Sequence, residues 1–339
     1  MMKHIFLLAF AALLLLPGKA SAQGCEEPAD DDQMIKMFGY LQTEYNYQFK
    51  DEAESAFNFR RARLGATGNI PYDFSYYVLM EMSPMISGNG SAYLLDAFIS
   101  YNRWEWAKIS VGSFKNPFSM DLGGTACSGL HTIFRSRAVD QFIVPQRDMG
   151  LMILGGNRET FLQYRVAFMN GVGTLNHENN NKKDFVGRVI LHPIDALYVG
   201  GSYRKAYPLA DEGEERTSYA LEGEFNLGNF KLLGEYIYDE GAVDRSLGGG
   251  CGGELLPIGD ERKGAYVQAM YMTQFNIQPV FKYEFFDAGI DDYREDIMTF
   301  GVNYFFNDWT RLQVNYLYRA EEPTEVKDDG LYLQLQVRF

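Results

Sequence analysis

Long apolar runs are missing from this 339-residue chain after its first two dozen residues. No later stretch approaches the roughly 18 to 20 apolar residues that a membrane-spanning helix needs, which argues against a helical membrane protein. Residues 1–22 instead predict a cleaved export signal, because a short apolar run leads to the small-residue site "ASA" at 20–22. We expect residues 23–33 to be a periplasmic N-terminal segment. The exported chain then either stays soluble or crosses a membrane as a β-barrel.

Basic residues and metal-ligand patterns are also scarce. The chain has 31 Lys and Arg against 45 Asp and Glu, a net charge of −14, which excludes a general nucleic-acid binder. It has four histidines and no C-x-x-C or H-E-x-x-H motif, so we expect no metal site and no cofactor. His131, near Ser128 and Ser136, is the most tempting hydrolase candidate, but no G-x-S-x-G elbow accompanies it. We therefore expect no enzymatic activity and no catalytic residues.

Only three cysteines are present. Cys127 lies in "GGTACSG" and Cys251 in "LGGGCGGE", both glycine-rich and typical of loops. Disulfides are permitted in an exported protein. Because both cysteines fall in long connections of the pattern described below, we predict a Cys127–Cys251 disulfide.

What the sequence does contain is strict alternation of apolar and polar residues, as in "LYLQLQVRF" at 331–339. Strand side chains alternate between two faces, so the leucines, valine and phenylalanine share one face and the glutamines and arginine the other. Similar segments of about ten residues, the length of a tilted barrel strand, recur at 39–49, 73–82 and 310–319. A soluble sandwich would turn the apolar face toward a core, whereas an outer-membrane barrel would turn it toward lipid.

About sixteen such segments follow one another, and the connections between them alternate between short and long. Short connections include 69–71, 228–229 and 307–308, and long ones include 116–147, 171–183 and 239–263. Outer-membrane barrels show this alternation, with short periplasmic turns and long extracellular loops. Aromatic residues make up 15% of the chain, which suits interfacial girdles. We therefore predict an all-β fold, a 16-stranded antiparallel transmembrane β-barrel over residues 34–339.

Five segments carry a more specific resemblance. They are "FNFRRARLGATG" (57–68), "LLDAFISYN" (94–102), "ISVGSFKNPFS" (109–119), "RSRAVDQFIVPQRDMGLMILGG" (135–156) and "AFMNGVG" (167–173). In this order they resemble the phosphate-selective porin family, the porin O and P group. The resemblance implies a sixteen-stranded channel in the bacterial outer membrane, usually a homotrimer, with basic residues lining the pore.

Anion selectivity needs inward-facing cations at the narrow part of a pore, and arginine suits phosphate because its planar fork makes paired hydrogen bonds. Arg61 and Arg63 share a strand face and should point inward, whereas Arg60 falls where the strand changes phase, which a β-bulge would explain. Residues 116–147 predict a constriction loop folded into the barrel. Its charged residues could line the pore or pair with one another and fix the loop. The candidates for pore lining and anion binding are Arg60, Arg61, Arg63, Lys108, Lys115, Arg135, Arg137, Arg147 and Arg165.

The outer connections depart from an anion-collecting channel. Residues 210–216, 287–296 and 320–329 are rich in acidic side chains, which would repel phosphate at the mouth. We expect a passive, water-filled channel for small solutes, with anions such as phosphate as the first choice. A general or cation-preferring porin and a plugged structural or adhesion barrel are the alternatives. The expected partners are outer-membrane lipid, lipopolysaccharide, small anionic solutes and further copies of the chain in a homotrimer.

Overall fold

The computed structural model describes residues 34–50, 54–174, 176–208, 214–244 and 255–339. The predicted export signal, the predicted periplasmic segment and Cys251 lie outside these ranges. The described strands are β1 (Lys36–Gln48), β2 (Glu54–Ile70), β3 (Phe74–Glu81), β4 (Tyr93–Tyr101), β5 (Lys108–Lys115), β6 (Arg147–Gly155), β7 (Leu162–Met169), β8 (Asp184–Ile194), β9 (Leu197–Ala206), β10 (Arg216–Leu227), β11 (Phe230–Gly241), β12 (Glu261–Tyr271), β13 (Ile277–Asp287), β14 (Arg294–Phe305), β15 (Thr310–Glu322) and β16 (Gly330–Arg338). The described helical segments are α2 (Ser83–Ile86), η1 (Ser119–Gly124), η2 (Cys127–Gly129) and α3 (Arg137–Phe142).

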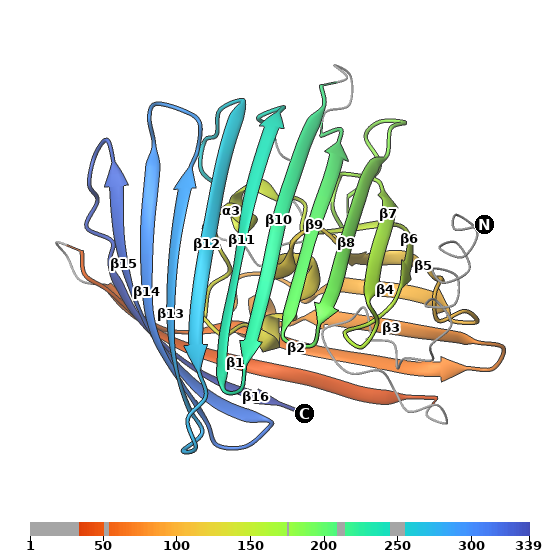
Figure 1. Ribbon diagram of the computed structural model, residues 1–339, viewed down its shortest axis with the longest axis horizontal. Helices are drawn as coiled ribbons and strands as arrows, with labels where there is room; N and C mark the ends of the chain where they lie inside the picture. Colours follow the sequence, from red (N-terminus) through yellow and green to blue (C-terminus); the bar gives the residue numbers. More distant parts are fainter. Residues whose placement is uncertain (1–33, 51–53, 175, 209–213, 245–254) are drawn as a thin grey trace, which may run out of the picture.

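The strands form one closed antiparallel barrel (Figure 1). Each strand pairs with its neighbours in the chain, and β1 pairs with β16 from Tyr40 opposite Arg338 to Gln48 opposite Gly330. The predicted 16-stranded antiparallel barrel is therefore confirmed. In the described part of the chain, no helix combines the length and the apolar character needed to cross a bilayer.

The barrel is apolar outside and polar inside. On β16, Leu335 and Val337 are 43% and 38% exposed, whereas Gln334 and Gln336 are 1% and 2% exposed. This is the reverse of a soluble sandwich, in which the apolar face would be covered. All three tryptophans, Trp104, Trp106 and Trp309, lie exposed at the end with the short turns, as expected for an interfacial aromatic girdle.

A bulge interrupts the β1–β2 ladder at Arg60. Gln42 lies opposite Arg61 and Thr43 lies opposite Phe59, so Arg60 is the extra residue. The predicted bulge is confirmed. It keeps Arg61 and Arg63 on the inner face and brings Arg60 within 3.2 Å of Glu44 and over the ring of Phe134.

Closure of the barrel depends on a small residue in β1. The backbone of Gly39 exchanges two hydrogen bonds of 2.9 and 3.0 Å with Phe339, whose ring lies against the glycine. A Cβ atom on Gly39 would lie 2.7 Å from the ring of Phe339 and 2.5 Å from the carbonyl oxygen of Arg63. Any larger residue would therefore push the last strand away from the first.

The connection between β5 and β6 does not extend outward. Residues 116–146, called here the inner segment, carry η1, η2 and α3 inside the barrel (Figure 1). The predicted bounds were 116–147, and Arg147 already belongs to β6. The inner segment contacts inward-facing side chains of β1 and of β9 to β16, so it crosses much of the lumen.

Candidate pore lining

Paired charges line one side of the lumen, on β8 to β12. Arg188 lies 2.7 Å from Glu222, Arg204 lies 3.0 Å from Asp184, and Arg216 lies 2.8 Å from Asp239, which also binds Arg262. All these side chains are buried, and buried charges are tolerated when they are paired. We call this group the ionic wall: Asp184, Arg188, Arg204, Arg216, Glu222, Asp239 and Arg262.

The ionic wall and its neighbour Glu235 hold the inner segment through backbone groups. Arg216 donates to the carbonyl of Phe142 at 2.6 Å, and Arg204 donates to that of Val144 at 3.0 Å. The carbonyl of Phe142 lies at the C-terminal end of α3, where carbonyl groups lack partners inside the helix, and that of Val144 follows two residues later. On β11, Glu235 accepts from the hydroxyl of Ser119 and the backbone amide of Met120, at the start of η1.

Neutral amides line the opposite side, on β13 to β16 and β1. They hydrogen bond in sequence around the barrel: Gln334 donates to Gln313, Gln313 donates to Asn303, and Asn303 donates to Gln278, at 2.9 to 3.1 Å. These partners lie directly opposite one another in neighbouring strands. We call this group the amide wall: Gln42, Gln278, Asn303, Gln313, Asn315, Gln334 and Gln336.

The amide wall also binds backbone groups of the inner segment. Asn315 accepts from the backbone amide of Ile133 at 2.8 Å, Asn303 donates to the carbonyl of His131 at 2.9 Å, and Gln336 donates to that of Ser128 at 3.2 Å. An amide side chain both donates and accepts, so one row of amides can satisfy its own members and a crossing backbone.

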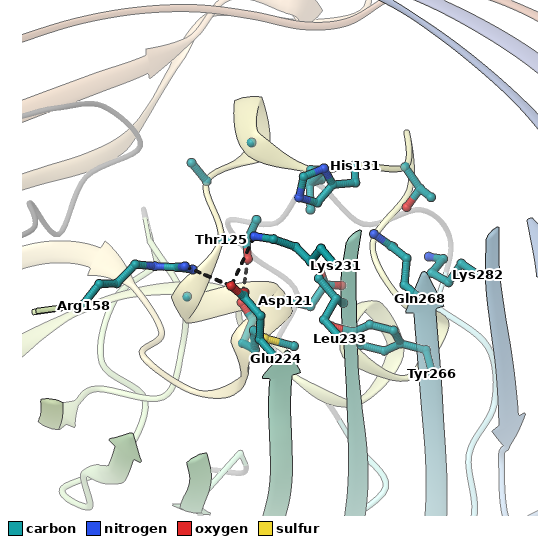
Figure 2. Close-up of a pocket in the computed structure, with 16 residues that line it drawn as sticks. Asp121, Thr125, His131, Arg158, Glu224, Lys231, Leu233, Tyr266, Gln268 and Lys282 are labelled. Atoms are coloured by element: carbon teal, nitrogen blue, oxygen red, sulfur yellow. Dashed lines mark hydrogen bonds and ion pairs between the residues drawn. The ribbon is translucent and has the colours of Figure 1, made fainter. Parts of the chain in front are cut away.

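A cavity of about 180 Å³ lies between the inner segment and strands β10 to β13 (Figure 2). The Arg158 side chain is 65% exposed and marks its opening at the short-turn end. On the cavity wall, Glu224 accepts from Arg158 at 3.1 Å and from Lys231 at 3.2 Å. Burial lowers the pKa of His131, which also lines the cavity, to about 4, so this imidazole is neutral at pH 7.

A smaller cavity of about 60 Å³ lies between η1 and β6 to β9 and is lined by Arg165 and Gln163. Arg165 donates to the carbonyl of Gly123 at 2.6 Å. The cavity therefore sits beside a point where the inner segment is fastened to the wall.

The predicted basic residues of β2 point inward but are engaged by other side chains. Arg63 lies 2.7 Å from Glu81 and also donates to the hydroxyl of Tyr40 and the sulfur of Cys127. Arg61 donates to Gln42 at 2.8 Å. The structure therefore builds these arginines into the wall and the inner segment.

The predicted basic residues near the inner segment follow the same pattern. Arg137 lies 2.8 Å from Glu295, Arg147 lies 3.0 Å from Asp96, and Arg135 lies 3.5 Å from Asp121. Lys115 donates to the carbonyl of Thr125 at 3.1 Å, and Lys108 is half-buried at the short-turn end of β5. These contacts favour pairing over a direct pore role, but the partners of Arg137 and Arg147 lie on β14 and β4, and only Arg135 pairs with an acid of the same loop.

Cys127 is the described half of the predicted disulfide. The sulfur of Cys127 is buried beside Arg63 and Arg135, and its predicted disulfide partner Cys251 lies outside the described residues, so that bond stays a prediction.

Among the described residues, the imidazole of His131 contacts Gln278 at 3.2 Å, and neither Ser128 nor Ser136 hydrogen bonds to it. The geometry of a serine hydrolase is not assembled at this point.

Sequence reasoning did not identify the amide wall or several cavity residues. Arg158, Lys231 and Gln268 lie near the short-turn ends of their strands, far from the arginine-rich segments. The glutamines of 331–339 were visible on the polar face. Their significance depends on which residues lie opposite them in neighbouring strands.

Residues 35–126 match the family model of phosphate-selective porins O and P. The resemblance noted in the sequence is confirmed over this span, and the matched part contains β1 to β5, η1 and the start of the connection to η2. Comparison with curated protein sequences gives no match.

Solved structures of bacterial outer-membrane proteins share the fold. Salmonella typhi OmpF in complex with daunomycin aligns with a TM-score of 0.73 and 14% identity, covering 93% of this chain and 100% of that one. The outer-membrane channel DcaP of Acinetobacter baumannii aligns with a TM-score of 0.66 and 16% identity, covering 96% and 100%. A trimer form of Vibrio cholerae OmpT aligns at 0.64 and 13%, covering 91% and 100%. At these identities the likeness establishes the porin fold alone.

Proposed function

We propose that this chain is a bacterial outer-membrane porin, a passive, water-filled channel for small solutes that the inner segment narrows. The observation that carries the proposal is a closed barrel with an apolar outer face, a polar inner face and a connection folded across the lumen. Such a protein performs no chemistry on its solute. It supplies a polar path, a constriction and an electric field.

The charges inside favour a channel with weak charge selectivity. Most cations on the inner wall lie within hydrogen-bonding distance of a carboxylate, as Arg63 does with Glu81 and Arg188 with Glu222. A paired cation exerts a much smaller field on a passing ion than an isolated one. Phosphate and other small anions form the second candidate substrate class, which the family match over residues 35–126 supports.

The reversal potential of single channels under a KCl gradient, with phosphate titrated in, separates these candidates. We expect a potential close to zero and no block by phosphate. A strong chloride-side potential with phosphate block would instead establish the anion channel, and Arg61→Ala or Arg63→Ala would then weaken the block. A chain that conducts no ions in the bilayer would refute the channel and leave the plugged structural barrel.

We also propose that the chain forms a homotrimer and that its outer face contacts outer-membrane lipid. A homotrimer is supported by the trimer form of the Vibrio cholerae OmpT structure, which shares the fold. Outer-membrane phospholipid and lipopolysaccharide are the expected surroundings of the exposed apolar face. Native mass spectrometry of the detergent-extracted protein tests both, since it resolves the number of chains and any lipopolysaccharide that stays bound.

A further inference from the structure

The larger cavity contains polar side chains whose hydrogen-bonding groups are unused. Gln268 and Tyr266 of β12 are 5% and 7% exposed and both line the cavity (Figure 2). Within the described ranges, neither the amide of Gln268 nor the hydroxyl of Tyr266 has a hydrogen-bond partner. Leaving a buried polar group unsatisfied is costly, so groups held this way favour a polar occupant. Together they offer donors and acceptors in one place.

Each charged side chain around the same cavity has a partner of opposite charge, although Glu224 serves two cations. Glu224 is shared by Arg158 and Lys231, and Lys282 lies 2.8 Å from Glu284. Asp121 accepts from the backbone amide of Ser136 at 2.7 Å and lies 3.5 Å from Arg135. An anion entering this space would have to compete with Asp121, Glu224 and Glu284 for the cations, whereas an uncharged solute would leave these ion pairs intact.

The cavity also offers apolar surface next to its free polar groups. The ring of Tyr266 and the side chains of Leu233, Leu130 and Met120 belong to its lining. A sugar ring has hydroxyl groups at its edge and C–H groups on its faces, so both kinds of surface are matched. Arg158 places the cavity opening at the short-turn end, where a solute can enter or leave the channel.

From these features we propose that the cavity between the inner segment and β10 to β13 is a binding subsite for a small uncharged, hydroxyl-bearing solute, such as a single sugar ring. The subsite deepens the proposed channel function and rests on it. Gln268 and the hydroxyl of Tyr266 hold the solute by hydrogen bonds, and Tyr266 and Leu233 pack against its ring. Phosphate differs from this occupant, because it would bind most strongly through charge-assisted hydrogen bonds to cations that here already contact Glu224 and Glu284.

Block of single-channel KCl current by glucose tests the subsite. We expect glucose to reduce the current in a saturable way, and Gln268→Leu to raise the half-blocking concentration about tenfold through the loss of its hydrogen bonds. Tyr266→Phe keeps the ring and removes only the hydroxyl, so it provides a second, milder variant with the same direction of change. Gln163→Leu is the matched control, because Gln163 lies at the same end of the barrel and lines the smaller cavity.

The outcomes separate the subsite from the channel. Equal loss of glucose block in the Gln163→Leu and Gln268→Leu variants would overturn the assignment to this cavity. A wild-type channel that conducts ions but is blocked by phosphate and not by glucose would overturn the sugar subsite alone. A wild-type chain without conductance would overturn the channel, and the subsite with it.

Discussion

The two sides of the lumen hold the same inner segment by different chemistry. The ionic wall fastens the end of α3 through arginines that also need carboxylate partners, whereas the amide wall fastens residues 128–133 through neutral groups. Each buried arginine of the ionic wall depends on an acid from another strand. The amides hydrogen bond to one another around the barrel.

This difference predicts unequal tolerance of substitution. Removing one member of a buried ion pair leaves an uncompensated charge, which typically costs about 3–5 kcal/mol. Removing one amide from a neutral row leaves unsatisfied dipoles, at about 1–3 kcal/mol. The ionic wall should therefore control whether the barrel interior folds, and the amide wall should control how firmly the inner segment is held.

The largest expected effect comes from removing most of the inner segment, which both walls hold. Replacing residues 119–142 with a short Gly-Ser linker should raise single-channel conductance several-fold, because the strand ladders stay intact while the lumen is cleared. The same replacement in the exposed connection 85–91, between β3 and β4, serves as the control and should leave conductance unchanged. Unchanged conductance after removal of 119–142 would show that the inner segment is not the constriction.

Asp239 is the residue at which we test the ionic wall, because its carboxylate pairs with two arginines. Asp239→Asn removes the negative charge shared by Arg216 and Arg262 and should lower the unfolding free energy by about 3–5 kcal/mol. Urea unfolding followed by tryptophan fluorescence measures this change. Asp260→Asn, at an exposed position close by in the chain, should have almost no effect.

The amide wall is tested at Gln336, which accepts from Gln42 and Arg311 and donates to the carbonyl of Ser128. Gln336→Leu should cost about 1–3 kcal/mol in the same unfolding measurement and increase current fluctuations of the open channel. Asn58→Leu, at an exposed position on β2, is the control. If Gln336→Leu lowered the unfolding free energy as much as Asp239→Asn does, the proposed distinction between the two walls would be wrong.

The smallest expected effect is a pH dependence at His131, where the amide wall meets the inner segment. The pKa of His131 is lowered to about 4 by burial, whereas an exposed histidine in the unfolded chain titrates near 6.5. The unfolded state therefore binds more protons between these values, and the unfolding free energy falls as the pH drops from about 6.5 toward 4. His131→Gln should remove this part of the dependence, so the variant and the wild type should converge in urea midpoint at pH 7 and diverge at pH 5.

The sequence by itself determined the strand pattern of this protein. Alternation with period two, and connections that alternate in length, are local properties that can be read along the chain, and they predicted the closed barrel and the bulge at Arg60. The family resemblance was equally local, because it rested on short motifs in the first half of the chain.

Only the tertiary structure decided which polar residues meet inside. Arg137 pairs with Glu295, and Ile133 binds Asn315, across more than half the chain in the second case. Such partners depend on the register between strands, on barrel closure and on the path of the inner segment, and no residue pattern near Arg137 or Ile133 specifies them. In the sequence the nine predicted cations could line the pore or pair with other groups, and in the fold eight of them contact a carboxylate, an amide or a carbonyl. The unused groups of Gln268 and Tyr266 could be recognised only after every neighbouring partner had been placed.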